Sequence, residues 1–264
     1  ICYGELVSTK IISGYLNHKG WKNSLLDARD MIKTDNNYRS AKVDWNKTKE
    51  KIMSLINIGG NIVTQGFIAS DSNNFTTTLG REGSDYSAAI FGYCLNAQSV
   101  CVWKDVPGIL NSDPRYFKNS ILLNSLSYEE AIELSYYGAS VIHPKTLQPL
   151  KRKEIPLYVK SFFKPNEKGT KVGKNLSLSP DIPCYIIRKN QILISISSLD
   201  FSYILEDNIY QIFKLFNQNK IKVNLIQNSA ISFIVCVEDI NGNLNNLLID
   251  IKAKYNVNIC EKVN

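Results

Sequence analysis

The order in which strand-like and helix-like segments follow one another constrains the fold of this chain more than any other feature. Up to residue 162, short apolar runs alternate with segments whose apolar residues recur at helical spacing. This alternation is typical of an α/β layer with a mostly parallel sheet. We expect helices over 5–18, 86–93 and 127–138, and strands over 23–28, 59–69, 99–106 and 155–162.

The pattern changes at 164–183, a stretch rich in Pro, Gly, Lys and Ser that we interpret as a loop or domain boundary. The segments after it predict the order β-α-β-β-α-β, the ferredoxin-like split motif. We therefore expect two domains, over 1–185 and 186–264. The predicted strands are 191–197, 221–227, 230–238 and 257–261. The first helix has the apolar face Ile209, Ile212, Phe213 and Phe216, with Asp207 or Asn208 as its N-cap residue. The second helix has the apolar face Leu244, Leu247, Leu248 and Ile251.

Composition argues against several classes of protein. No run approaches 18 apolar residues, which argues against a membrane span, and the N-terminal residues do not resemble a secretion signal. The six cysteines form no C-x-x-C pair, so we expect reduced core thiols in a cytoplasmic protein. With two histidines, no metal-ligand set is predicted. The net charge of +7 suits a small anionic ligand, because the lysines are scattered rather than gathered in a nucleic-acid-binding stripe.

The segment TTTLGREGSDYSAAI, residues 76–90, places polar and charged residues where a predicted strand is followed by a helix. Backbone N–H groups at such a junction form a natural anion site. Arg81 can bind a carboxylate or phosphate through two hydrogen bonds. Ser84 can cap the helix, and Asp85 can orient an amine or a metal–nucleotide complex. The structural alternative is a capped helix with a polar turn and no ligand.

Four blocks of the chain, in order, resemble those of aspartokinases. Residues 76–90 are similar to the family signature T-T-L-G-R-G-G-S-D. VWKDVPGILNSDPR (102–115) resembles the nucleotide segment W-T-D-V-x-G-I-x-x-x-D-P-R, and YGASVIHPKTLQP (137–149) resembles the block F-G-A-K-V-L-H-P. YGELVST (3–9) resembles the element H-G-E-L-x-S. The C-terminal segments then resemble the ACT domain that follows the kinase domain in this family.

The resemblance implies ATP-dependent phosphorylation of the β-carboxylate of L-aspartate, with Mg²⁺ accompanying ATP. The product, 4-phospho-L-aspartate, is the first intermediate of lysine, threonine and methionine biosynthesis. By position in the motifs, Arg81 is expected to hold the α-carboxylate of aspartate and Glu5 its α-ammonium. Asp85 and Ser84 are the expected catalytic residues, Asp85 on the substrate's other side and Ser84 near its β-carboxylate.

The resemblance also implies a nucleotide site formed by Lys104, Asp105, Leu110, Arg115 and Ser140. Lys104 and Asp105 occupy the positions of the family's Thr-Asp pair, and Arg115 is expected on phosphate. Some assignments have structural alternatives, with Glu5 as a solvated helix residue, Lys104 as an exposed lysine and Arg115 as a turn residue. His143 is expected to pack and hydrogen-bond rather than act as a base, because a carboxylate nucleophile is already ionised at neutral pH.

The sequence departs from the family pattern in several places. The segment K-x-G-G-[TS]-S, whose lysine neutralises the transferred phosphate, is absent, and Gly59-Gly60 reads as strand instead. We therefore expect a fragment that is inactive alone. Ser140 stands where many members have lysine, with Lys145 close by, and Glu82 stands where glycine is common. The chain ends where a second ACT unit would begin, and a fused homoserine dehydrogenase domain downstream stays an open alternative.

Two functions other than aspartokinase are weighed. A non-catalytic regulatory subunit that senses amino acids through an ACT domain would have no need of Arg81, Ser84 and Asp85. Another amino acid kinase, such as a glutamate or acetylglutamate kinase, fits less well with the C-terminal unit and with VPGILNSDPR at 106–115.

The resemblance further implies an amino-acid effector at an interface between ACT domains, and therefore a homodimer. Asn224 and Ala230 stand where lysine-sensing relatives tend to have acidic residues, and an uncharged amide holds an ammonium less strongly than a carboxylate does. We therefore expect weak or altered lysine sensing, with a purely structural dimerisation unit as the alternative. The effector segments are 199–208 and 223–232, and their candidate residues are Asp200, Glu206, Asp207, Asn224 and Ser229.

Overall fold

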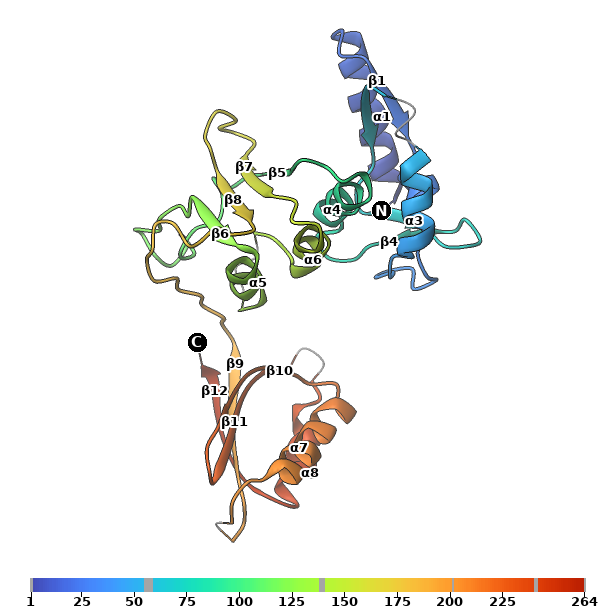
Figure 1. The fold of residues 1–264 in the computed structure, drawn as a ribbon. Helices are drawn as coiled ribbons and strands as arrows, with labels where there is room; N and C mark the ends of the chain where they lie inside the picture. Colours follow the sequence, from blue (N-terminus) through green and yellow to red (C-terminus); the bar gives the residue numbers. More distant parts are fainter. Residues whose placement is uncertain (1, 55–58, 138–140, 201, 240–241, 264) are drawn as a thin grey trace. The chain divides into compact units, whose positions relative to one another are not determined.

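The computed structural model describes residues 2–54, 59–137, 141–200, 202–239 and 242–263. The chain divides into two compact units, unit 1 (Ile1–Ile186) and unit 2 (Ile187–Asn264), with separate hydrophobic cores (Figure 1). Across the described ranges, no helix combines the length and the apolar character that crossing a membrane requires.

Helix α4 (Gly83–Leu95) lies at the centre of unit 1 (Figure 1). It packs against α3 (Trp45–Met53) on one side, and against β5 (Val100–Lys104) and α6 (Pro144–Arg152) on the other. The predicted face of Tyr86, Ala89, Ile90 and Tyr93 lies on this helix, with Ala89 and Ile90 fully buried. The helix therefore joins the two hydrophobic clusters of unit 1, one around Ile52 and Leu79 and one around Leu126 and Leu157.

Among the described residues of unit 1, the strands form one four-stranded sheet and two pairs. The sheet has the order β5-β7-β8-β6, in which the outer pairs are parallel and the central pair β7–β8 is antiparallel. The pair β1–β2 is parallel, and β3–β4 is an antiparallel hairpin. The prediction of an α/β unit with parallel strands is confirmed. The bounds are β1 (Asn23–Leu26), β2 (Asn61–Thr64), β3 (Ile68–Ser70), β4 (Thr76–Thr78), β6 (Ser125–Ser127), β7 (Leu157–Ser161) and β8 (Thr170–Gly173).

The predictions for two segments of unit 1 are wrong in detail. The strand expected over 59–69 is two strands, because Gly59, Gly60 and Phe67 have positive φ angles of 63°, 72° and 69°. Backbone in that region cannot continue a strand, so β2 begins only at Asn61. The polar stretch 164–183 is not only a loop, since it contributes β8 to the middle of the sheet.

The remaining helices of unit 1 are α1 (Cys2–His18), α2 (Ala28–Met31) and α5 (Tyr128–Tyr137). The predicted capping box at the start of α5 is present, because Ser127 Oγ accepts from the N–H of Glu130 at 3.1 Å and the Glu130 carboxylate accepts from the N–H of Ser127 at 2.8 Å. Helix α1 buries Thr9 and Ser13 against its neighbours, whereas its apolar stripe is exposed. That stripe consists of Tyr3, Val7, Ile11, Ile12 and Tyr15, each more than half exposed.

Unit 2 has the predicted β-α-β-β-α-β order. Its antiparallel sheet has the strand order β10-β11-β9-β12, and α7 and α8 cover one face. Ile212 and Phe216 of α7 and Leu247 and Ile251 of α8 are buried against Val235 of the sheet. The bounds are β9 (Gln191–Ser197), α7 (Glu206–Gln218), β10 (Lys222–Asn228), β11 (Ser232–Glu238), α8 (Leu244–Lys252) and β12 (Asn256–Val263).

Two smaller expectations about these elements are corrected. Helix α7 has Leu205 as its N-cap residue rather than Asp207 or Asn208. Asn208 instead accepts a hydrogen bond from the Leu205 N–H at 3.0 Å, as the third residue of a capping box does. All six cysteines are free, but only Cys94 is buried, and Cys101 and Cys260 are exposed because they point from the open faces of strands.

Two helical glycines give a matched test of the packing around α4. A Cβ at Gly92 would lie 2.5 Å from Val100 Cγ2, whereas one at Gly14 of α1 would meet nothing within 4 Å. Gly14→Ala should raise the unfolding free energy by about 0.5–1 kcal/mol through helix propensity. Gly92→Ala gains the same contribution from helix propensity, but overpacking against Val100 costs about 1–3 kcal/mol, so this variant should be less stable than wild type. Denaturant unfolding of both variants measures this, and equal stabilisation by both would show that α4 does not pack on β5 as described.

Candidate active site

The loop before α4 sets where the predicted site residues lie. Gly80 and Glu82 have φ angles of +82° and +54°, so the chain turns twice and the helix begins at Gly83. Glu82, in the left-handed region, is the N-cap residue. Ser84 therefore does not cap the helix as predicted; it is the second helical residue, and its side chain is exposed.

The start of α4 is packed closely against the turn between β2 and β3. A Cβ at Gly66 would lie 2.9 Å from Ser84 Cα, and one at Gly83 would lie 2.6 Å from Phe67 Cδ2. The Phe67 N–H donates to Ser87 Oγ at 2.9 Å, and that hydroxyl donates to the Gly83 carbonyl at 2.9 Å. These contacts fix the helix start relative to the ends of two strands.

An ion pair joins two of the sequence motifs. Lys104 Nζ, at the end of β5, lies 2.6 Å from Asp85 Oδ2 in the first turn of α4. The side chains are only 22% and 15% exposed, so this pair is shielded from water more than a surface pair is. The structure thus brings together the motif at 76–90 and the motif at 102–115. Lys104 is not an exposed lysine, which was the structural alternative for this residue.

Glu82 connects this pair to a third motif. Its Oε2 is buried and accepts no hydrogen bond within the described chain. Burial raises the pKa of the Glu82 carboxyl, and the neighbouring Asp85 raises it further. Lys104, Arg81 and the backbone N–H of His143 oppose this by favouring the ionised form. The beginning of α6 therefore lies beside Glu82.

The remaining residues predicted to bind substrate are not joined to this pair. The Arg81 side chain is exposed, and its guanidinium makes no hydrogen bond or ion pair with any described residue. Glu5 lies in the first turn of α1, and its carboxylate likewise has no partner among the residues described. No contact links Glu5 to Arg81, so a role shared by these two residues stays a prediction.

The other predicted nucleotide residues follow β5 along the chain. Asp105 follows the strand and is exposed, and Leu110 is half-buried in a bridge to Leu122. The Arg115 guanidinium binds Asp113 within its own turn, with Nη2 2.7 Å from Oδ2. This bond lowers the pKa of Asp113. Ser140, also predicted here, lies outside the described residues.

His143 and Lys145 lie at the start of α6. His143 is the N-cap residue of that helix, and its Nδ1 accepts a hydrogen bond from the Lys145 N–H at 3.1 Å. This geometry agrees with the expected hydrogen-bonding role of His143. Within the described part of the chain, no group of three His, Cys, Asp or Glu side chains could hold a metal ion. A Mg²⁺ ion would fit here only with nucleotide phosphates as its main ligands and at most one or two carboxylates, such as the exposed Asp105.

In unit 2 the structure brings some of the predicted effector residues together. The Ile204 N–H donates to the Ala230 carbonyl at 2.9 Å, which joins the loop before α7 to the turn between β10 and β11. Asp200, Glu206 and Asp207 belong to that loop and the following helix start, and Ser229 belongs to the turn. Hydrogen bonding from Ser202, first from its side chain and then from its N–H, which lies 3.1 Å from Asp200 Oδ1, lowers the pKa of Asp200.

Asn224 lies at the other end of the sheet. It occupies a bulge in β10, is 9% exposed, and donates to Gln191 Oε1 at 2.8 Å. Ser229 instead lies near Ser232, which pairs with Ser197 at the far end of β9. The six-residue offset between Gln191 and Ser197 corresponds to roughly 20 Å of strand. Within one chain, Asn224 therefore does not form a cluster with the other effector candidates.

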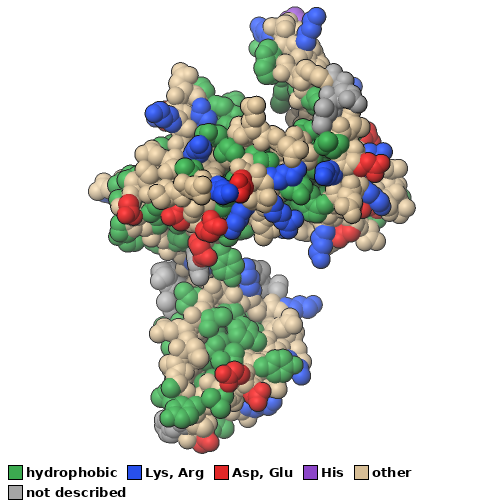
Figure 2. Space-filling view, viewed as in Figure 1, with side chains coloured by type: hydrophobic (Ala, Val, Ile, Leu, Met, Phe, Trp, Pro, Cys, Tyr) green, Lys and Arg blue, Asp and Glu red, His purple; other side chains and the backbone are tan. Residues whose placement is uncertain are grey.

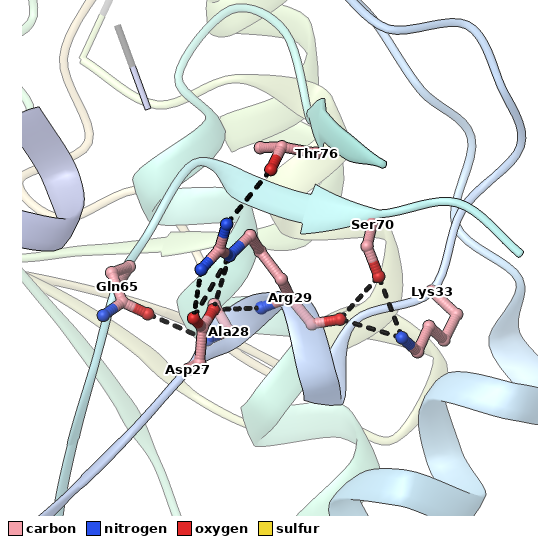
Figure 3. Close-up of polar contacts among 7 residues, drawn as sticks. All are labelled: Asp27, Ala28, Arg29, Lys33, Gln65, Ser70 and Thr76. Atoms are coloured by element: carbon pink, nitrogen blue, oxygen red, sulfur yellow. Dashed lines mark hydrogen bonds and ion pairs between the residues drawn. The ribbon is translucent and has the colours of Figure 1, made fainter. Parts of the chain in front are cut away.

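A polar network that the sequence interpretation missed holds the β3–β4 hairpin (Figure 3). The Arg29 guanidinium binds Asp27, with Nη2 2.6 Å from Oδ2, and reaches Thr76 Oγ1 at 3.3 Å. Ser70 Oγ donates to the Arg29 carbonyl at 2.6 Å, and Lys33 Nζ donates to Ser70 Oγ at 2.8 Å. The predicted strand over 23–28 included Asp27, whereas in the structure Asp27 comes directly after β1, a position where polar residues signal an ordered sheet edge. The network fixes the strand that leads into the 76–90 motif.

The face of unit 1 seen in Figure 2 carries lysine, arginine and acidic side chains close to one another around its middle. The visible face of unit 2 instead shows a patch of apolar side chains. Exposed apolar residues of unit 2 include Tyr203, Leu205, Tyr210 and Ile249. On this face of unit 1 the charged side chains are thus mixed in sign.

Comparison with known proteins identifies the relatives of the chain. The amino acid kinase family matches residues 1–161. The lysine-sensitive aspartokinase 3 of Escherichia coli K12 is 32% identical over 242 residues, which is 90% of this chain and 54% of the relative. The crystal structure of E. coli aspartokinase III in complex with aspartate and ADP aligns with a TM-score of 0.80 and 31% identity, over 98% of this chain and 60% of that one. Clostridium acetobutylicum aspartate kinase aligns with a TM-score of 0.84 and 26% identity, over 98% and 59%.

These comparisons confirm the resemblance that the four motifs predicted. The chain nevertheless spans only 54% of the length of that E. coli relative, and 60% and 59% of the two aligned structures. The activity, substrates and partners of the whole protein are therefore matters of proposal.

The raised pKa of Glu82 has a consequence for stability. Between the ordinary carboxyl pKa and the raised one, the folded protein binds more protons than the unfolded protein, so the unfolding free energy falls as pH rises. Glu82→Gln removes the titrating carboxyl and with it this fall in the unfolding free energy. Its stability relative to wild type should therefore increase as pH rises from about 4 through that window, with Lys104, Asp85 and Arg81 as the facing charges.

Glu129 is the matched control, because it is exposed and Lys151 lowers its pKa. Glu129→Gln should show a small pH dependence of the opposite sign. Denaturant unfolding of wild type and both variants from about pH 4 to about pH 8 measures the effect. A difference for Glu82→Gln that does not change with pH would show that Glu82 is not desolvated.

Proposed function

The chain belongs to the amino acid kinase family, and on that premise we propose that it is part of an aspartokinase. The proposed reaction is ATP-dependent phosphorylation of the β-carboxylate of L-aspartate in the cytoplasm. The relatives support this proposal, since one is named an aspartokinase and a similar structure was solved with aspartate and ADP.

One observation carries the proposal: the 2.6 Å contact between Asp85 Oδ2 and Lys104 Nζ. Asp85 belongs to the motif assigned to aspartate, and Lys104 to the motif assigned to nucleotide. Phosphoryl transfer requires the two substrates to be aligned, with charge neutralised between them. A contact between these motifs is the arrangement that such a reaction needs.

In the proposed step, a β-carboxylate oxygen of aspartate attacks the γ-phosphorus of ATP. The bond from that phosphorus to the β,γ-bridging oxygen breaks, giving 4-phospho-L-aspartate and ADP. No proton has to be removed from the nucleophile, because an aspartate carboxyl is ionised at neutral pH. Mg²⁺ bound with the nucleotide would supply charge neutralisation at the phosphates.

The protein groups then have binding and orienting roles. The free guanidinium of Arg81 is available to clamp the α-carboxylate of aspartate, and Glu5 is assigned to its ammonium. Lys104 neutralises Asp85 and, by its place in the nucleotide motif, is assigned to a phosphate. Arg115 would have to exchange Asp113 for a nucleotide phosphate, and Ser84, Asp105, Leu110 and Ser140 complete the proposed site.

Regulation by an amino acid is proposed for unit 2, as an ACT domain within a homodimer. The hydrogen bond between Ile204 and Ala230 supports this, since it joins the two segments assigned to the effector. Similarity to an aspartokinase named lysine-sensitive makes lysine the first candidate. The placement of Asn224 away from Asp200, Glu206 and Asp207 supports weak or altered lysine sensing within one chain.

Aspartate binding tests the assigned function. The 264-residue chain should bind aspartate and Mg·ADP in calorimetry, and Arg81→Ala should weaken aspartate binding by about 2–4 kcal/mol, because one side of a charge pair is lost. Arg188→Ala, which removes an arginine bound to Glu238 in unit 2, is the control and should leave aspartate affinity unchanged. Unchanged aspartate affinity with weakened ADP affinity would contradict the role assigned to Arg81.

Effector binding is tested separately. Titration with lysine, threonine and methionine should show lysine binding weaker than that of a site built with ionised carboxylates, because Asn224 is uncharged and turned toward Gln191. Calorimetry with the chain and with the triple variant of Asp200, Glu206 and Asp207 measures this. Tight lysine binding that survives the triple substitution would show that the effector site lies elsewhere.

A further inference from the structure

Asn111 closes the neck of the loop that carries Arg115. Its N–H donates to the Ile121 carbonyl at 2.9 Å, and its Oδ1 accepts from the Ile121 N–H at 2.8 Å. These bonds continue a short antiparallel ladder that includes the bridge between Leu110 and Leu122. Asn111 is only 8% exposed, so these bonds are shielded from competition by water. The chain between Asn111 and Ile121 therefore forms a loop that is closed at its base.

The same residue also binds residues 183–185, a segment that we call the strap. Asn111 Nδ2 donates to the Pro183 carbonyl at 3.1 Å, and the Asn111 carbonyl accepts from the Tyr185 N–H at 2.7 Å. The strap lies near the end of unit 1, and unit 2 begins at Ile187. The N–H and Oδ1 of Asn111 thus bind the loop, and its carbonyl and Nδ2 bind the strap.

A second contact joins the strap to the interior of the loop. The rings of Phe117 and Tyr185 stack with their centroids 5.6 Å apart and an angle of 28° between their planes. Ser112 Oγ donates to Ser120 Oγ at 2.9 Å, and Ser120 Oγ donates to the Phe117 carbonyl at 2.8 Å, so Phe117 is fixed to both ends of the loop. The strap therefore contacts the loop at its base and again two residues after Arg115.

Arg115 has no comparable anchor of its own. Its side chain is 76% exposed, and its guanidinium binds Asp113 within the same turn. An exposed ion pair between residues so close in sequence adds little to stability, and it does not connect the turn to the rest of unit 1. The position of Arg115 relative to the candidate active site is therefore set by the contacts of Asn111 and Phe117.

We propose that Asn111 is a positioning residue, and that it and the strap together hold the loop at 111–121 where Arg115 can bind the phosphates of a nucleotide. This inference rests on the proposed function for its ligand, a nucleoside diphosphate or triphosphate. The segment through which the chain passes from unit 1 to unit 2 thus supports part of the nucleotide site. Without the strap contacts the loop populates other conformations, and the apparent nucleotide affinity falls with the fraction of molecules that stay competent.

Tyr185→Ala tests the strap, because Tyr185 is 52% exposed and its truncation leaves the hydrophobic clusters of unit 1 intact. Loss of the aromatic pair should weaken Mg·ADP binding about three- to tenfold, while aspartate affinity measured without nucleotide stays unchanged. Tyr185→Phe should bind like wild type, since it keeps the ring and the Tyr185 hydroxyl makes no hydrogen bond with any described residue. Asn111→Asp keeps the acceptor for Ile121 but replaces the donor to Pro183 with an acceptor, so it should also weaken Mg·ADP binding.

A double-mutant cycle with Arg115→Ala tests whether the strap acts through Arg115. In that background Tyr185→Ala should change Mg·ADP affinity by less than about twofold, because the loop no longer carries a phosphate ligand. The matched control is Phe213→Ala in unit 2, since Phe213 packs on the ring of Phe233 with the same centroid distance of 5.6 Å. The control should leave Mg·ADP affinity unchanged. An equal effect of Tyr185→Ala with and without Arg115 would overturn the positioning role.

Hydrogen exchange of the chain without ligand gives a second, independent measurement. Tyr185→Ala and Asn111→Asp should both speed exchange of the amides within 111–121, whereas Phe213→Ala should not. Unchanged exchange in the two strap variants would overturn the attachment of the loop to the strap, whatever the ligand results. Failure of wild type to bind Mg·ADP would overturn the proposed function and the phosphate role of the loop, whereas faster exchange would still support its attachment to the strap.

Discussion

The missing side chains of Gly66 and Gly83 are what allow the start of α4 to lie against the turn between β2 and β3. The Phe67 backbone then reaches Ser87, and the first turn of the helix is held by a strand end rather than by a conventional cap. Asp85 follows two residues after Gly83, and its carboxylate meets Lys104 at the end of β5. The site thus depends on packing between backbones before it depends on any charge.

Much of the fold follows from the sequence, and the misses have local causes. Helical spacing predicted α4, α7 and α8, since buried apolar residues repeat along one face. The strands β6 and β8 were missed because each has only three or four residues and polar neighbours, so their pairing is decided by the rest of the sheet. The break at Phe67 was missed because a positive φ angle is rare outside glycine.

Single residues of the site were predicted from the sequence, but the contacts between them were not. The resemblance to aspartokinases identified Asp85 and Lys104, but nothing in the sequence shows that the two side chains form an ion pair. Arg115 was predicted as a phosphate ligand, whereas in this structure its turn lets it bind Asp113 two residues away. The network of Asp27 and Arg29 was missed because it joins residues almost fifty positions apart, through Thr76. Long-range polar contacts require the tertiary fold before they can be recognised.

Hydrogen bonds attach helix α1 to its unit, and none of its residues belongs to the hydrophobic clusters of the described chain. Ser13 Oγ donates to Asn23 Oδ1 at 2.6 Å, and the N–H of Asn23 donates to Asn17 Oδ1 at 2.9 Å. The three hydrophobic clusters contain no residue of this helix, and its tyrosine, valine and isoleucine side chains stay hydrated. Because most of the apolar stripe of α1 is already exposed, unfolding of this helix adds less new apolar surface, and so less to the heat-capacity change of the chain, than unfolding of the buried helix α4 does.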